Sequence, residues 1–567
     1  MSKHLHFFAV GRRSDPFVLL VVTLVVSRLP FAQDASAFSH HEDLGVGKDE
    51  RALPGDLPGD AGPAVVTRLV YLMNDFSDDE HLDLGVLTRF EYVVPHAFLP
   101  ADRARPATPP LGYIAVKPRL RPVCRLLIIP STRLRLVVSI VLFVVALASP
   151  ALAYVPEKTP HRNAEAAART AIGQRGALGT TAGVVLMRGG REFFSINGGR
   201  SMAPASVLKL ATTTTAIVKF GPDHRFATRA LVSNRGAGIS TLSLVGGGDP
   251  TLATEVYRQH RYLPAPTDVI KRPAFPDGSA TVDQLAARIK AAGVRSIGTL
   301  VADDTVFDSV KTQEGWLPRY LVNDPDVGYI DGLTINEGYG DIDQKTLVPN
   351  PALTAGKALA SALNVLGISV RRVTTGRAPR GAAEIARVES PTVGEIVDFT
   401  NRYSINYNAE MLLKDIGASF GGRGSTAAGI AVVKSTLRAL GVSTRGLVMT
   451  DGSGLSVLDR VTPRTVAGLL ERILTKQGPG WDALRGSIPV SGEPGTLLKR
   501  MTGPLTKDRV HGKTGQIEHV RAMSGWVVPL DGVPIVYVAI FNNARSPSAL
   551  TKPLDVLGVL LALFPGT

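Results

Sequence analysis

The chain has 567 residues, a length that suggests about three to four domains at roughly 150 residues each. Apolar residues make up 44% and charged residues 20% of the chain, so disorder throughout is excluded and a large core can form. The single cysteine excludes a disulfide framework, an iron–sulfur cluster and a zinc site built from thiolates.

The net charge of +14 permits an anionic partner without identifying one. Residues 1–153 hold 16 basic and 15 acidic side chains, so nearly all of the excess lies in residues 154–567. A nucleic-acid groove needs basic clusters beside stacking aromatic residues, and the excess shows no such pattern. We therefore expect no nucleic-acid partner, and the charge suits an exported protein among anionic wall polymers.

An apolar run in the N-terminal part has the order of a secretory signal. Arg133 and Arg135 precede an apolar stretch over residues 136–148, and residues 151–153 read small-x-small. We predict a signal peptide over residues 123–153, which makes residues 1–122 a mis-called or disordered extension. The alternatives are a genuine long leader, or an anchor that gives weak membrane association.

The elements that follow suggest a sheet assembled from both ends of the mature chain. The pattern predicts a helix at 163–173, a hairpin at 184–196, a helix at 206–220, strands at 522–528 and 534–541, and a helix at 550–564. Strands at both ends with helices between them are typical of an α+β fold. We expect a discontinuous domain, 154–230 with 386–567, and an inserted Gly/Pro/Asp-rich region at 231–385.

The first motif with chemical potential is Ser206-Val207-Leu208-Lys209, at a predicted helix start. Residues three apart share one face of a helix, so Lys209 can direct its amine at the Ser206 hydroxyl. A serine becomes a useful nucleophile when a neighbour removes its proton, and a desolvated lysine can do so. Taken alone, the motif also fits a capping serine beside a solvated lysine.

Two further motifs follow. Ser404-Ile405-Asn406 can present a hydroxyl and an amide to one cleft. The alternative is that Ser404 caps a helix. Lys513-Thr514-Gly515 precedes the C-terminal strands and suits a carboxylate, because its charge and hydroxyl act together and its glycine permits close approach. A phosphate-binding loop is excluded, because that motif needs a glycine where this chain has Lys507.

The three motifs occur in the order found in serine β-lactamases and penicillin-binding proteins. Further matching segments are Asp249-Pro250-Thr251-Leu252, Asp303-Asp304-Thr305, Thr334-Ile335-Asn336-Glu337-Gly338, Asp451-Gly452-Ser453-Gly454-Leu455-Ser456 and Gly495-Thr496-Leu497. Over about residues 170–545 the chain resembles the class C low-molecular-mass penicillin-binding proteins, the D-alanyl-D-alanine carboxypeptidase/endopeptidase family. The resemblance implies a penicillin-binding-protein/β-lactamase-like transpeptidase fold, an antiparallel sheet flanked by helices, with a mainly β insert between the first two motifs.

The resemblance also implies a mechanism and its residues. Ser206 would be the acylated nucleophile, Lys209 its base, and Ser404 the proton relay to the leaving D-alanine. Substrate binding would fall to Asn406, Lys513, Thr514, Gly515 and Gln516, with Asp304 as an acidic candidate in the insert. The substrates would be peptidoglycan stem peptides, β-lactams would be covalent inhibitors, and no metal or cofactor would be needed. Such an enzyme acts in the periplasmic or extracytoplasmic cell envelope.

Three departures from the family pattern mark this chain. Gln516 stands where threonine often follows Lys-Thr-Gly, Val457 and Asp459 stand where Arg and Asn are common, and Ile405 is unusual in the second motif. None removes a catalytic hydroxyl or amine, so we expect an active enzyme. The alternatives are a secreted β-lactamase and a non-catalytic wall-binding protein that retains the fold.

Overall fold

The computed structural model describes residues 3–10, 17–26, 65–74, 85–91, 159–173, 177, 179–233, 238–262, 278–322 and 325–563. The chain divides into two compact units, Met1–Ile128 and Ile129–Thr567. The predicted signal peptide, residues 123–153, lies outside the described residues.

The first unit contains a four-stranded antiparallel sheet. Its order is β1 (Lys3–Val10), β2 (Phe17–Val26), β3 (Val65–Asn74) and β4 (Gly85–Glu91). The apolar run at residues 17–26 is therefore an inner strand of this sheet.

The main sheet of the second unit joins the beginning and the end of that unit. Its antiparallel order is β12 (Val510–Ile517), β13 (Val520–Val527), β14 (Ile535–Asn542), β5 (Thr181–Arg188) and β6 (Arg191–Ile196). The predicted hairpin and the two predicted C-terminal strands are confirmed. Strand β12, which carries Lys-Thr-Gly, is an edge strand and so leaves one side open for another group.

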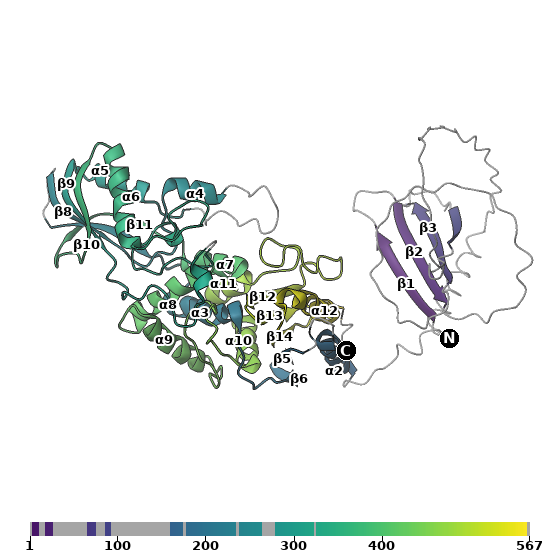
Figure 1. The fold of residues 1–567 in the computed structure, drawn as a ribbon. Helices are drawn as coiled ribbons and strands as arrows, with labels where there is room; N and C mark the ends of the chain where they lie inside the picture. Colours follow the sequence, from purple (N-terminus) through teal and green to yellow (C-terminus); the bar gives the residue numbers. More distant parts are fainter. Residues whose placement is uncertain are drawn as a thin grey trace, which may run out of the picture. The chain divides into compact units, whose positions relative to one another are not determined.

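Helices cover both faces of this sheet, in accord with the predicted α+β class (Figure 1). One face packs against α2 (Thr159–Gly173) and α12 (Thr551–Ala562). The other faces α3 (Lys209–Phe220), α7 (Val393–Tyr403), α8 (Asn406–Phe420), α9 (Thr426–Ala439), α10 (Pro463–Thr475) and α11 (Pro479–Ser487). Because successive side chains of a strand point to opposite faces, strands covered on both sides carry continuous apolar runs such as residues 535–541.

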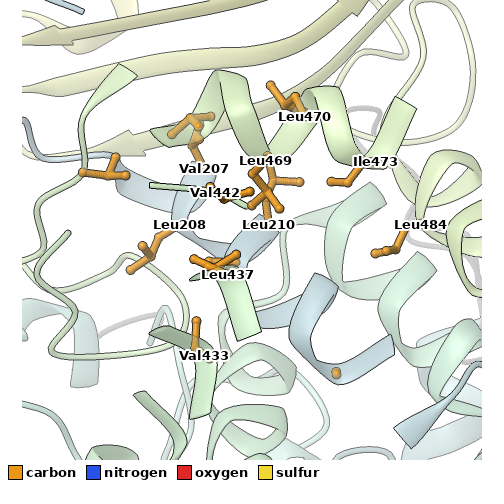
Figure 2. Close-up of a cluster of buried hydrophobic side chains, with 14 of the residues drawn as sticks. Val207, Leu208, Leu210, Val433, Leu437, Val442, Leu469, Leu470, Ile473 and Leu484 are labelled. Atoms are coloured by element: carbon orange, nitrogen blue, oxygen red, sulfur yellow. The ribbon is translucent and has the colours of Figure 1, made fainter. Parts of the chain in front are cut away.

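The core between the sheet and the helices surrounds α3. Figure 2 shows Val207, Leu208 and Leu210 near Leu437 of α9 and Leu469 of α10, all in one buried cluster. At about 1.5–3 kcal/mol for each fully buried aliphatic side chain, this packing holds the start of α3 in a fixed position. The serine–lysine motif therefore stands on a rigid part of the molecule.

A second five-stranded sheet lies between the first two motifs in the sequence. Its order is β10 (Ser369–Thr375), β9 (Ser296–Asp303), β8 (Gly238–Val245), β7 (Ala227–Val232) and β11 (Ala383–Glu389). Strand β9 pairs in parallel with both of its neighbours, and the other pairs are antiparallel. Helices α5 (Val282–Ala291) and α6 (Pro351–Val365) pack on this sheet, and α4 (Glu255–Tyr262) belongs to the same stretch of chain.

Side chains from this stretch contact α8 and the loop between α9 and α10. Trp316 donates its indole N–H to Asp451 at 3.0 Å, and Lys414 of α8 pairs with Asp308 at 2.6 Å. Both interactions are largely removed from water, so each side chain depends on its partner for satisfaction. Among the residues that the structure describes, none of the helices combines the length and hydrophobicity that crossing a bilayer requires.

Candidate active site

Ser206 lies in a single 3-10 turn, η2 (Ala205–Leu208), that runs directly into α3. The predicted helix start is therefore confirmed, with a tighter first turn. Ala205 has a φ of 50°, which is strained for a residue with a side chain. A Cβ added to Gly454 would lie 2.0 Å from the Ala205 carbonyl oxygen, and one on Gly515 would lie 3.2 Å from the Ser206 nitrogen. Glycines of two distant motifs thus allow three segments to converge at this serine.

The Lys209 amine is the centre of the site. Its Nζ lies 2.8 Å from Ser206 Oγ, 2.7 Å from Asn406 Oδ1 and 2.8 Å from the Ser453 carbonyl oxygen. A neutral amine has two N–H groups and one lone pair. Because the amide and carbonyl oxygens can only accept, the lone pair is left for the Ser206 hydroxyl proton.

Burial favours that neutral form. Lys209 is fully buried, and the loss of hydration lowers its pKa from 10.5 to about 7. The negative charges of Asp451 and Glu410 act in the opposite direction but are outweighed. A large fraction of Lys209 is therefore neutral close to pH 7, which is the form that the predicted role of a base requires.

The second and third motifs meet through Ser404 and Lys513. Ser404 ends α7 in a left-handed conformation, with φ 62°, which turns the chain before α8 begins. Lys513 on β12 donates to Ser404 Oγ at 2.8 Å and to the Thr514 carbonyl at 2.9 Å. Desolvation, and next the nearby Lys209, hold the pKa of Lys513 well below its usual value. Ser404 thus has its hydroxyl fixed by the buried Lys513 amine rather than by a helix N-terminus.

Asn406 bridges the first motif and the stretch that carries the second sheet. It is the first residue of α8; its Oδ1 accepts from Lys209 and its Nδ2 donates to the Asp326 carbonyl oxygen at 3.0 Å. These two bonds fix the orientation of the amide. Asn406 therefore orients the lysine, in addition to the substrate-binding role implied by the sequence.

Two cavities open at this cluster, and Ser206, Asn406 and Gln516 line both. The first has a volume of about 400 Å³, and its wall includes Ser404, Gly495, Thr496, Leu498, Lys499, Arg500, Thr514, Gly515 and Arg521. The second has a volume of about 460 Å³, and its wall includes Arg319, Tyr320, Asp326, Leu455, Ile517, Glu518 and Pro547. Ser206 therefore lines two cavities that offer space for a substrate.

A buried acidic network under Lys209 did not emerge as part of the site from the sequence. Glu410 accepts N–H groups from Gly452 and Ser453, and Asp451 accepts the N–H of Gly454 at 2.7 Å. These bonds shape the loop whose Ser453 carbonyl holds the lysine. Burial, and next the charge of Asp451, raise the pKa of Glu410 to about 8. The segment Asp451-Gly452-Ser453-Gly454-Leu455-Ser456, which matches the family, was the feature of the sequence that could have indicated this network.

Asp304 stands apart from the other residues proposed from the sequence. It lies directly after β9, next to the carboxyl group of Asp331, which pairs with Lys311. Burial raises the pKa of Asp331 to about 6, against the effect of Lys311. Asp304 lines neither of the two cavities at Ser206. The structure therefore brings together Ser206, Lys209, Ser404, Asn406, Lys513, Thr514, Gly515 and Gln516, but not Asp304.

The residues that depart from the family pattern have defined places. The Gln516 amide oxygen accepts a hydrogen bond from the Arg521 guanidinium, inside the first cavity. Asp459 accepts the Thr450 N–H at 2.7 Å, and Ile405 is buried at the start of α8. Within the described part of the chain, no group of three or more His, Cys, Asp or Glu residues is arranged to hold a metal ion.

Comparison with known proteins gives one family. A model of the D-Ala-D-Ala carboxypeptidase 3 (S13) family matches residues 165–347 and 340–559. A D-alanyl-D-alanine carboxypeptidase of Actinomadura sp. (strain R39) is 30% identical over 475 residues, which cover 68% of this chain and 82% of that relative. Carboxypeptidase DacB of Mycolicibacterium smegmatis is 29% identical, over 66% of this chain and 78% of the relative.

The fold has a solved counterpart. Penicillin binding protein 4 (dacB) of Haemophilus influenzae matches with a TM-score of 0.55 at 20% sequence identity, over 66% of this chain and 96% of that one. This likeness supports the α+β penicillin-binding-protein fold that the motif order implies.

Proposed function

Because the chain belongs to the D-Ala-D-Ala carboxypeptidase 3 (S13) family, we propose a defined division of labour among its site residues. The protein is a serine D-alanyl-D-alanine carboxypeptidase of the penicillin-sensitive, peptidoglycan-directed type. Ser206 is the nucleophile and Lys209 its base, while Ser404 relays a proton to the leaving group. Lys513 and Thr514 bind the terminal carboxylate.

Acylation begins with the neutral Lys209 amine removing the Ser206 proton. The serine oxygen attacks the carbonyl carbon between the two terminal D-alanines, and the oxyanion is stabilised by the backbone N–H groups of Ser206 and Gln516. The bond from that carbon to the D-alanine nitrogen then breaks. The nitrogen takes, through Ser404, the proton that Lys209 removed from Ser206, and Lys513 holds the Ser404 hydroxyl in place. Lys209 is then neutral again before deacylation. Free D-alanine and a Ser206 ester result.

Deacylation uses one water molecule. The water loses a proton to Lys209, its oxygen attacks the ester carbon, and the Ser206 oxygen leaves with that proton. The peptide, shortened by one D-alanine, departs with a new carboxylate. Proton transfers thus balance over the cycle, and Lys209 returns to its neutral form.

The observation that carries this proposal is the 2.8 Å contact between Lys209 Nζ and Ser206 Oγ, together with the pKa of about 7 that burial gives the lysine. A general base works best when its pKa lies near the working pH. A capping serine beside a solvated lysine would have an exposed amine, whereas Lys209 is fully buried.

Labelling with a fluorescent penicillin tests the assignment. The wild type should acquire a persistent covalent label, and Ser206→Ala should acquire none at the same drug concentration. A secreted β-lactamase would instead turn the drug over and lose the label, and a non-catalytic wall-binding protein would never be labelled. Ser201→Ala is a matched control, because Ser201 is exposed and bonds the Gly446 carbonyl away from the cavities.

Product analysis separates two activities on the wall. Release of D-alanine from a muramyl pentapeptide reports carboxypeptidase activity, and cleavage of a cross-linked dimer reports D,D-endopeptidase activity. We propose carboxypeptidase activity, and the assay reports whether cleavage of the cross-linked dimer accompanies it.

The route to the cell envelope is also a proposal. We propose that residues 123–153 direct export, and that residues 154–230 with 386–567 form the catalytic domain around an insert at 231–385. N-terminal sequencing of the native protein tests the first point. A mature protein that begins near Tyr154 agrees with it, and one that begins well before Tyr154 contradicts it.

A further inference from the structure

Arg521, one of the cations that line the first cavity, has no assigned task. Arg521 is the second residue of β13, and it lines the same cavity as Ser206, Ser404 and Thr514. Nothing in the proposed reaction uses it. Its position in the cavity and the state of its guanidinium together indicate a role in substrate binding.

The guanidinium is only partly satisfied. One terminal nitrogen donates to the Gln516 amide oxygen, while its Nε is buried without a hydrogen-bond partner in the described structure. No carboxylate of the described residues lies within ion-pairing distance of it. The neighbouring Arg500 differs, because it pairs with Asp555 at 2.6 Å. A guanidinium that is half-buried, with its Nε out of reach of water, is poorly satisfied unless a ligand supplies an acceptor.

The register of the sheet places Arg521 beside the Lys-Thr-Gly strand. Gln516 of β12 lies opposite Arg521 of β13, and Thr514 lies two residues before Gln516. Because side chains two apart on a strand, and those directly opposite on its neighbour, share one face, these three side chains form one polar row at the sheet edge. The Thr514 hydroxyl and the guanidinium can therefore meet one carboxylate.

Arg521 also provides a positive charge for a ligand, whereas the Lys513 amine is already engaged and its burial disfavours the charged form. The Lys513 amine already donates to Ser404 and to the Thr514 carbonyl, and its burial works against the charged form. Burial lowers the pKa of Arg521 only to about 10, so the guanidinium stays cationic at neutral pH. Its planar fork of N–H groups matches a carboxylate in a bidentate manner.

We propose that Arg521 binds the C-terminal carboxylate of the peptide substrate beside Thr514, and that Gln516 is a positioning residue for its guanidinium. This inference rests on the proposed function and deepens it. It also explains the departure at position 516, because a glutamine reaches the guanidinium across the strand pair.

A cycle of substrates and variants tests the proposal. The substrates are a peptide that ends in D-alanyl-D-alanine and the same peptide with a terminal amide. In the wild type, amidation should lower kcat/KM by about 100-fold or more, because a bidentate charged contact is lost. In Arg521→Gln the same amidation should lower kcat/KM by about tenfold or less. For the unmodified peptide, this variant should differ from the wild type mainly by a higher KM. Gln516→Leu should reduce the amidation effect in the same direction.

Two further variants keep the result interpretable. Arg464→Gln removes an equal charge at the exposed pair with Glu192, outside both cavities, and should leave the amidation effect as in the wild type. Arg521→Lys keeps the positive charge but loses the paired N–H groups of the guanidinium, so the effect of amidation should be intermediate. This variant still tests the proposal if Arg521→Gln does not fold. An amidation effect equal in wild type, Arg521→Lys and Gln516→Leu overturns the proposal. Failure of penicillin to label the wild type would instead overturn the proposed function.

Discussion

The pH dependence of Ser206 acylation follows from the burial of Lys209. With a pKa of about 7, half of the lysine side chains are neutral at pH 7. A lysine with its ordinary pKa of 10.5 would be neutral in about one molecule in 3,000 at that pH. The fold therefore raises the neutral fraction of Lys209 at pH 7 by about 10³, on the order of 4 kcal/mol.

The rate constant for acylation by a fluorescent penicillin should follow the neutral fraction of Lys209. It should rise about tenfold for each pH unit below about pH 7 and level off above it. Lys209→Arg removes the base, because arginine does not deprotonate in proteins, and should lower the rate constant by about 10³-fold or more without a rise near pH 7. Rapid mixing and gel fluorescence measure both.

A charge change near the lysine provides the control. Asp326 raises the pKa of Lys209 through its negative charge, and its side chain lines the second cavity. Asp326→Asn should therefore move the midpoint of the profile to lower pH. A flat wild-type profile between about pH 5 and 9, with both variants folded by thermal unfolding, would refute the base assignment.

Three predictions concern stability. Burial raises the pKa of Asp249 from 3.8 to about 6, so its folded carboxyl stabilises the protein below about pH 4 and loses that contribution as the pH rises through about 6. Asp249→Asn should accordingly gain up to about 3 kcal/mol relative to the wild type between about pH 4 and 7, measured by urea unfolding. Gly454 has a φ of +78°, and Gly454→Ala places a Cβ against the Ala205 carbonyl. This substitution should lower the free energy of unfolding by at least about 2 kcal/mol and slow penicillin labelling. Thr392→Ala removes the capping box of α7 and should cost about 1 kcal/mol by the same unfolding assay.

Each of these has a contrary outcome. A pH-independent difference between Asp249→Asn and the wild type would show that the carboxyl is not the titrating group. Unchanged labelling in Gly454→Ala would show that the close approach to Ala205 does not position the nucleophile. A Thr392→Ala protein as stable as the wild type would mean that water replaces the cap without loss.

The pairing of Ser206 with Lys209 could be predicted because it is local. Residues three apart in a helical turn face one another whatever the rest of the chain does, and the structure places the two atoms 2.8 Å apart. The hairpin at residues 181–196 and the C-terminal strands were predictable for a similar reason, since apolar runs and turn residues act over a few positions.

The remaining contacts depend on chain segments far apart in the sequence. Lys513 reaches Ser404 across 109 residues, and the Ser453 carbonyl reaches Lys209 across 244. Their residue types were visible, but no local pattern specifies which distant backbone oxygen a buried amine will meet. Asp304 illustrates the limit, because its place in a matching segment did not bring it to either cavity.

The sequence alone determined the three motifs, their order and the place of Lys209 three residues after Ser206, because side-chain chemistry and helical spacing are properties of short segments. Only the tertiary structure decided that burial lowers the pKa of Lys209 to about 7 and that Ser206 lines two cavities. It also decided that Arg521 lines the first cavity and donates a hydrogen bond to Gln516. The physical reason is that desolvation and strand register arise when distant segments pack together.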